Sequence, residues 1–410
     1  MYRNFLRLLS ALCLLFTFWP VFRFSGVTIF DWLTLIVIVF ALPYTPKERG
    51  APFSSFRLAT YGIVALAFAG ILSAAPSYDS NEHLQRVIHL TVALAGIIGL
   101  AYVLVNRKIL TVTEALSVLC LSAAASSAVC ILQGQFGILT GLIPDNPGGV
   151  KPWTRMVGLT EWPIEAGQVS DFGVIIGMGL AIYTRKSLLF LLPIVVNLYS
   201  LSYSASLTAV FALLIAFGLM CLHAKTYKPM LYGAAIFVCG IMLTFVLDAR
   251  RLTSRLEAFS QSQGNYSTVQ TREIQWSKAI DMIGPGTLLI GNGFSTLDLP
   301  YKIEIHNGVL ASVFHFGILG LTSQVLLIGF FAVRLRENAP RELRSILLGC
   351  TVIFMFSYMT GPALSRRSLW VPPLILAGYL TAAKQLDASR YKRTVGGLGL
   401  AASPELPVDS

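Results

Sequence analysis

The sequence predicts an all-α, polytopic integral membrane protein, and three observations support this fold class. Of the 410 residues, 55% are hydrophobic and only 12% are charged, whereas about a quarter of the residues of a soluble domain are charged. The mean hydropathy is +0.69. The apolar runs are about 17 to 25 residues long and do not alternate as a β-strand would, so each one fits a helix that satisfies its own backbone hydrogen bonds in lipid.

About twelve apolar windows of this kind follow one another along the chain. They lie near 5–22, 27–43, 58–76, 86–106, 109–132, 167–184, 187–202, 205–222, 230–247, 309–333, 345–362 and 369–384. We therefore expect a single transmembrane domain over residues 1–384. The longest polar connection, 248–308, is expected to be a loop that carries short helices. Residues 385–410 are small, polar and rich in Pro and Gly, which predicts a disordered tail.

The first window follows Arg3 and Arg7, as the apolar part of a signal peptide would. Trp19, Pro20 and Arg23 stand where a cleavage site would have small residues, so we expect a retained helix. With the N-terminus in the cytoplasm, about 19 basic residues fall on the cytoplasmic side, as the positive-inside rule requires. Both termini are then cytoplasmic and the long loop is outside. The same rule accounts for the net charge of +11, so we expect no nucleic-acid partner.

Among the basic residues that fall on the predicted outer side, against this bias, are Arg155, Arg366 and Arg367. Adjacent outward arginines favour an anionic ligand, because each guanidinium group can bind phosphate oxygens in a bidentate manner. The windows themselves hold few charges, and Asp171 is expected near the outer end of its helix. Ion-coupled transporters usually have charged residues near the membrane midplane, so the pattern favours chemistry at one face.

The long loop contains TREIQWSKAIDMIG, whose spacing predicts an amphipathic helix at the membrane surface. Trp276, Ile280 and Ile283 are expected on one side of this helix, with Arg272 one turn before the Trp. The GPG and GNG sequences that follow predict turns.

His306 lies at the mouth of the window that begins near 309, directly after the polar loop. An imidazole at the boundary between water and membrane, with an ordinary pKa near about 6.5, suits a general base. His315 is nine residues further on, about half a helical turn out of phase, so it should face away from His306. We expect His315 to pack or to make an interhelical hydrogen bond.

Four segments together resemble the superfamily of O-antigen ligases and Wzy-type polysaccharide polymerases. They are RMVGLTEWP, LSYSASLTA, TREIQWSKAIDMI with LLIGNGFS, and HNGVLASVFHFGILGL, and the resemblance covers about residues 150–380. It implies a multi-helix glycosyltransferase that uses undecaprenyl-diphosphate-linked glycans at the periplasmic face without a metal. His306 matches the catalytic histidine of this family, and Arg272 matches its diphosphate-binding arginine. The family commonly has a Ser-Arg pair where this chain has Ser202, Tyr203, Ser204 and Ala205, and another outward arginine, Arg155, Arg366 or Arg367, is expected to replace its charge.

Glycan transfer from a lipid diphosphate needs a base for the acceptor hydroxyl and cations for the leaving diphosphate. His306 and Arg272 are therefore the expected catalytic residues. Arg155, Arg366, Arg367, Trp276 and Asn307 are the expected substrate-binding residues. No Asp-x-Asp pair in an outward loop and no CxxC pair offers a metal site, so we expect no metal and no cofactor.

The sequence thus predicts a polymerase in the bacterial inner membrane that makes exopolysaccharide or O-antigen. It would move a growing glycan from undecaprenyl diphosphate to a lipid-linked repeat unit. Two alternatives stay open, namely a ligase that transfers the glycan to lipid A core or to a protein, and a transporter or flippase of lipid-linked sugars. The expected partners are the lipid-linked glycan and membrane lipids, and a protein that regulates chain length is left open.

Overall fold

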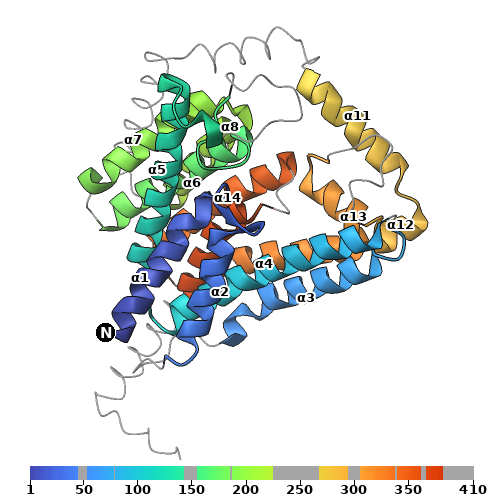
Figure 1. Ribbon diagram of the computed structural model, residues 1–410, viewed down its shortest axis with the longest axis horizontal. Helices are drawn as coiled ribbons and strands as arrows, with labels where there is room; N and C mark the ends of the chain where they lie inside the picture. Colours follow the sequence, from blue (N-terminus) through green and yellow to red (C-terminus); the bar gives the residue numbers. More distant parts are fainter. Residues whose placement is uncertain are drawn as a thin grey trace, which may run out of the picture.

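The computed structural model describes most of the chain and is almost entirely helical in that part, as the composition predicts (Figure 1). The described residues are 1–44, 53–77, 79–142, 155–184, 187–224, 267–293, 305–337, 339–361 and 366–381. One short hairpin is the only sheet among these residues.

The helices begin and end close to the predicted windows. They are α1 (Tyr2–Leu15), α2 (Ile29–Ala41), α3 (Arg57–Leu72), α4 (Ser80–Asn106), α5 (Val112–Phe136), α6 (Pro163–Thr184), α7 (Ser187–Ser204), α8 (Leu207–Ala224), α11 (Ser267–Asp281), α12 (Pro285–Ile290), α13 (Gly308–Leu335), α14 (Arg341–Thr360) and a last helix over 367–381. Short 3-10 helices are η1 (Phe16–Phe18), η2 (Phe53–Phe56) and η3 (Thr140–Leu142), and the strands are β1 (Arg23–Phe24) and β2 (Val27–Thr28). Every predicted window overlaps a helix except 230–247, which lies outside the described residues.

Six helices are long and apolar enough to cross a membrane, which indicates a membrane protein. They are Phe53–Leu72, Ser80–Asn106, Val112–Phe136, Pro163–Thr184, Gly308–Leu335 and Arg341–Thr360. The helices α2, α7 and α8 are apolar but shorter. The described part of the predicted loop 248–308 holds the short helices α11 and α12. The predicted tail, 385–410, lies outside the described residues.

The helix α6 is the centre of the bundle, since 83% of its most apolar window is buried, the largest share among the six. Small and polar side chains hold it against α5 and α7. The hydroxyl of Ser170 lies 2.9 Å from the hydroxyl of Ser127 and 2.6 Å from that of Ser200. Ser127 also donates a hydrogen bond to the amide oxygen of Asn197, 2.8 Å away. Such contacts hold helices together in lipid, where the surrounding tails are as apolar as leucine.

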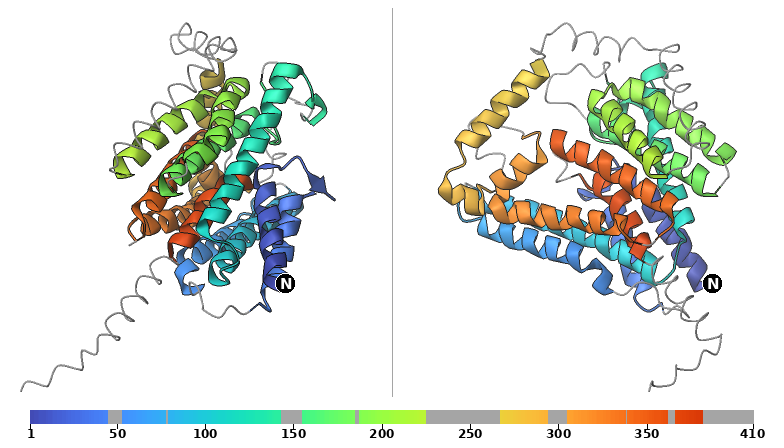
Figure 2. Two further views of the ribbon diagram at one scale, coloured as in Figure 1. Left: turned by 90° about the vertical axis from the view of Figure 1, so that its left-hand side faces the viewer. Right: turned by 180° about the vertical axis from the view of Figure 1, so that it is seen from behind.

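The helices α3 and α4 and the second half of α13 run side by side (Figures 1 and 2). The helix α13 bends at Gly317, whose φ of 64° and ψ of −162° are not helical. Its first half, Gly308–Phe316, therefore leaves the direction of the second half and packs against the end of α14. The ring of Tyr358 lies so close to Gly308 that a Cβ there would be 2.6 Å from ring carbons, and its hydroxyl lies 2.8 Å from that of Ser312.

The predicted GNG turn explains how the bend in α13 is stabilised. A kink leaves carbonyl groups of the preceding turn without their helical donors. The amides of Asn292 and Gly293 donate to the carbonyls of Phe314 and His315, at 2.7 and 3.0 Å. In return, the Nδ1 of His315 donates to the carbonyl of Gly293, 2.6 Å away. His315 thus has a structural role, but its hydrogen bond goes to the GNG turn and not to another helix.

Candidate functional site

A tight hairpin positions the first group of polar side chains. The strands β1 and β2 are antiparallel, with Arg23 paired to Thr28. The two residues between the strands, Ser25 and Gly26, have φ values of 52° and 77°, as the twist of a two-residue hairpin requires. Thr28 then begins α2, because its hydroxyl accepts a hydrogen bond from the backbone amide of Asp31, 3.3 Å away.

The start of α6 supplies two carboxyl groups and an indole. Glu161 forms an ion pair with Arg23. Trp162 directly precedes the helix and remains 39% exposed. Glu165 lies in the first turn, where the helix dipole favours a negative charge, and it is only 3% exposed. Its carboxyl group accepts a hydrogen bond from the hydroxyl of Ser368.

The last helix supplies two adjacent arginines with different surroundings. Arg367 forms an ion pair with Asp31 and donates a hydrogen bond to the hydroxyl of Thr28, 3.2 Å away. Burial, together with the positive charge of Arg23, lowers the pKa of the Arg367 guanidinium from its ordinary value. The guanidinium of Arg366 lies 6.0 Å from the ring centre of Trp162. Within the described residues Arg366 has no carboxylate partner.

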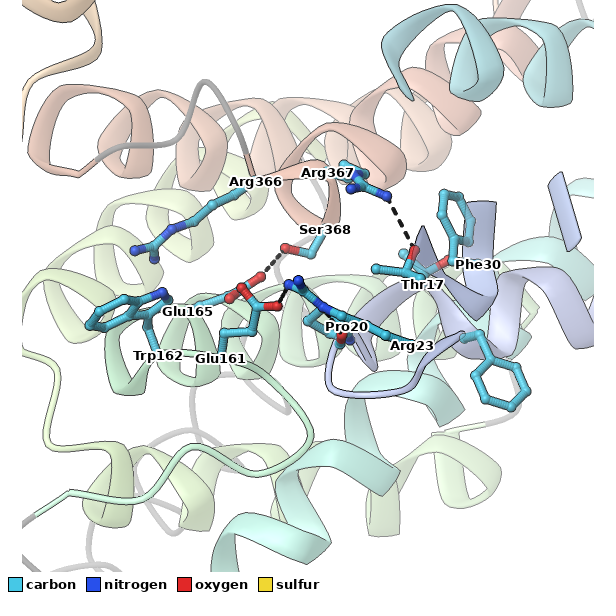
Figure 3. Close-up of a pocket in the computed structure, with 12 residues that line it drawn as sticks. Thr17, Pro20, Arg23, Phe30, Glu161, Trp162, Glu165, Arg366, Arg367 and Ser368 are labelled. Atoms are coloured by element: carbon cyan, nitrogen blue, oxygen red, sulfur yellow. Dashed lines mark hydrogen bonds and ion pairs between the residues drawn. The ribbon is translucent and has the colours of Figure 1, made fainter. Parts of the chain in front are cut away.

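These three segments enclose a cavity of about 190 Å³. Its walls are Phe16, Thr17, Pro20, Arg23, Thr28, Phe30, Glu161, Trp162, Glu165, Arg366, Arg367 and Ser368. Figure 3 shows Arg366 extended toward Trp162, and Arg23 directed toward Glu161. Thr17 is 5% exposed, and in the described part of the chain its hydroxyl has no hydrogen-bond partner. The cavity therefore has one buried polar group that a ligand can satisfy.

The charges around this cavity nearly cancel. Arg23 is paired with Glu161, and Arg367 is paired with Asp31. The remaining groups are the guanidinium of Arg366 and the carboxyl group of Glu165. This balance suits an uncharged polar ligand better than a diphosphate, which would bring at least two negative charges close to two carboxyl groups.

His306 lies in a second place, directly before α13. Its two neighbours fix the backbone. Ile305 is buried in an apolar cluster with Ala279, Ala311 and Phe314, and Asn307 caps the helix by accepting a hydrogen bond from the amide of Leu310, 3.0 Å away. The Nδ1 atom of His306 is shielded from solvent. Asn307, which the sequence predicts to bind substrate, thus also has a structural role.

The helix α11 packs its Ala279 into this cluster beside Ile305, and Ile283 contacts the same cluster. Trp276 lies one turn before Ala279 and Arg272 two turns before it, since residues three or four apart are neighbours on a helix. The side-chain nitrogen Nε of Arg272 and the Nε1 of Trp276 are shielded from solvent. Ile280 lies one turn after Trp276 on the same side of α11, and its side chain is 58% exposed.

Arg155 lies in a third place, at the end of α7. Its Nε donates a hydrogen bond to the carbonyl of Ser204, 2.9 Å away. The amide of the next residue, Met156, donates to the carbonyl of Tyr203, 3.0 Å away. The segment around Arg155 is therefore attached to the end of α7.

The structure thus places the predicted site residues in three groups. Arg366 and Arg367 line the cavity, Arg272 and Trp276 lie on the helix that packs beside His306 and Asn307, and Arg155 lies at the end of α7. The residues of the second and third groups are not among those that line the cavity.

Sequence reasoning missed the cavity residues Arg23, Glu165 and Thr17. One available signal was that 16–28, 161–165 and 366–368 all fall on the predicted outer side. Among the described residues no group of three or more His, Cys, Asp or Glu side chains is arranged to hold a metal ion.

Comparison with known proteins leaves the family open. No protein-family model matches the chain, and no curated protein is significantly similar to it.

Proposed function

We propose that the protein is a glycosyltransferase that lengthens a polysaccharide at the extracytoplasmic face of the bacterial inner membrane. The substrate is a growing glycan on undecaprenyl diphosphate, and the acceptor is a lipid-linked repeat unit. The observation that carries the proposal is an apolar cluster of Ala279, Ile305, Ala311 and Phe314. Ala279 belongs to α11, the helix that carries Arg272, and Ile305 directly precedes His306. The cluster therefore fixes α11 beside the segment that carries His306.

In this reaction His306 accepts the proton of the acceptor hydroxyl while that oxygen attacks the anomeric carbon of the donor. The bond between the anomeric carbon and the phosphate oxygen breaks, and undecaprenyl diphosphate leaves with the electron pair. Arg272 binds the phosphate oxygens as their negative charge increases. A positioned base contributes about 10²- to 10⁴-fold to such a rate.

Arg155 supports the same reading. Its Nε donates to the carbonyl of Ser204, at the end of α7, where the resembling family commonly has an arginine. A guanidinium group is a planar fork of N–H donors that matches phosphate. We therefore assign Arg155, with Arg272, to the lipid diphosphate.

The test is a polymerisation assay with purified protein and lipid-linked repeat units, in the absence of divalent ions. Wild-type protein should give products longer than one repeat unit, and His306→Ala should lose at least about 100-fold in rate. The matched control is His89→Ala, because His89 is exposed on α4 and belongs to no site. Equal rates for His306→Ala and His89→Ala would remove His306 as the base.

Two alternative functions, a ligase and a flippase, can be distinguished from a polymerase by their products. A ligase would make no longer lipid-linked product, but it would transfer finished glycan to lipid A core or to a protein. A flippase would move lipid-linked sugar across a liposome membrane without forming a bond. The six spanning helices fit either rival, and the group around His306 favours transfer chemistry.

A further inference from the structure

We propose that the cavity between β1, the start of α6 and the last helix binds an uncharged pyranose ring of the glycan, and that it is separate from the diphosphate site. This inference rests on the proposed function only for the source of the sugar, since the recognition itself requires no glycosyl transfer.

The first argument is charge. The ion pairs Arg23–Glu161 and Arg367–Asp31 leave one guanidinium and one carboxyl group, on Arg366 and Glu165. A sugar hydroxyl both donates and accepts hydrogen bonds, so a ring with several hydroxyls can donate to Glu165 and accept from Arg366. A diphosphate can only accept, and it would be repelled by the carboxyl groups of Glu161 and Glu165.

The second argument is the presence of groups that lack partners. The buried hydroxyl of Thr17 has no hydrogen-bond partner in the described residues, and leaving such a group unsatisfied costs about 1–3 kcal/mol. Among the described residues, the guanidinium group of Arg366 contacts only the ring of Trp162, at 6.0 Å from its centre, which is the outer limit of a cation–π interaction. Its guanidinium group is therefore available to turn toward a ligand.

The third argument is shape. The volume of about 190 Å³ is below the range of about 300 to 1,000 Å³ that is usual for drug-sized ligands, so it fits one ring and not an oligosaccharide. The indole of Trp162 and the rings of Phe16 and Phe30 provide apolar walls, which complement the C–H faces of a pyranose.

The experiment is saturation-transfer NMR on the purified full-length protein with methyl glucoside, methyl galactoside, methyl mannoside and N-acetylglucosamine, each at millimolar concentration. We expect transfer to at least one sugar, with an unchanged signal after addition of inorganic pyrophosphate. Glu165→Ala and Trp162→Ala should each weaken the binding at least about tenfold, because each removes a principal contact.

Two controls keep the result interpretable. Glu82→Ala removes a carboxyl group that pairs with Arg86 on α4, away from the cavity, and should bind sugar as wild type does. Trp162→Phe keeps an aromatic wall and should bind better than Trp162→Ala, provided that both variants elute as folded protein. Three results would each overturn the inference. They are no saturation transfer to any of the sugars, equal sugar binding by Glu165→Ala and wild type, and displacement of the sugar by pyrophosphate.

The outcome is separable from that of the polymerisation assay. A protein that binds a sugar here but makes no polymer would keep this inference and refute the polymerase. A protein that polymerises lipid-linked units but binds none of the sugars would refute this inference alone. Arg272→Ala, which targets the diphosphate, should leave sugar binding unchanged.

Discussion

The guanidinium Nε of Arg155 donates a hydrogen bond to the carbonyl of Ser204, 2.9 Å away, although 49 residues separate the two in the chain. This contact brings a cation to the end of α7. The end of α7 carries no basic residue, since Ser204 is followed by Ala205. The cation at this place therefore comes from a segment distant in the sequence.

We expect Arg155→Ala to lower kcat/KM for the lipid-linked donor at least about tenfold, because a charge-assisted hydrogen bond is worth about 1.5–3 kcal/mol. Arg155→Lys should lie between this variant and wild type, since lysine keeps the charge but loses the planar fork. The measurement is initial rate against donor concentration. Arg57→Ala, at an exposed arginine that begins α3, is the control, and an equal loss in this control would show a general effect of basic residues.

Gly317→Ala should destabilise the protein by about 2 kcal/mol or more, because a side chain at a left-handed φ is strained. At Gly317 the φ is 64°, and an added Cβ would lie 2.3 Å from the carbonyl oxygen of Leu289. The bend positions the half of α13 that follows His306, so activity should fall as well. Thermal unfolding of the purified protein measures the first effect.

Gly329→Ala is the matched control on the straight half of the same helix. There an added Cβ would meet only the Cδ2 of Leu58, at 3.6 Å, and alanine is the better helix former by about 0.5–1 kcal/mol. This variant should be at least as stable as wild type. A Gly317→Ala protein as stable as the control would show that the bend is not needed.

The helices were predictable because length and apolar composition are local properties. Their ends depend on capping, which is partly readable. Thr111 and Glu114 form a capping box that begins α5, and Asn307 caps α13. The bend at Gly317 was not predicted, since a glycine within an apolar run is compatible with a straight helix until a partner such as the GNG turn is placed.

The cavity could not be predicted, because its walls come from three segments whose proximity is set by packing alone. Arg367 was predicted as an outward arginine, but its ion pair with Asp31 and the ion pair of Arg23 with Glu161 were not predicted. These ion pairs change the ligand that the arginines are expected to bind. The charge of a paired guanidinium group is largely neutralised by its carboxylate partner, so its attraction for a phosphate is weaker. The pairing of His306 with Arg272 stays a prediction of the resemblance, and the apolar cluster shows only that Ala279 of α11 packs beside Ile305.

Asp171→Asn should leave the thermal stability unchanged or raise it. The helix α6 begins at Pro163, four residues before the predicted start, so Asp171 lies about 12 Å along the helix and not near its end. Its side chain is 0% exposed, and neither carboxylate oxygen has a hydrogen-bond partner among the described residues. A buried carboxylate without a partner is costly, and an amide of the same shape carries no charge.

Asp31→Asn gives the opposite expectation in the same measurement. It breaks the ion pair with Arg367 and leaves that guanidinium partly buried without its partner, so the unfolding temperature should fall. If Asp171→Asn fell as far as Asp31→Asn, the carboxyl group of Asp171 would have to contribute a stabilising interaction, such as a bound cation.

Ala279→Leu should reduce transfer activity more than it reduces overall stability. Ala279 is fully buried between α11 and the residues Ile305, Ala311 and Phe314. Extra methyl groups in a packed contact cost about 1–3 kcal/mol, and here the strain is relieved when α11 moves away from α13. That movement would displace Arg272, the proposed diphosphate ligand, relative to His306, the proposed base. The measurements are the polymerisation rate and the unfolding temperature, with Ile280→Leu as the control, because Ile280 is the next residue on α11 and is 58% exposed. A large activity loss in Ala279→Leu with a nearly wild-type unfolding temperature is the expected result, and full activity would show that the docking of α11 on α13 does not position the reacting groups.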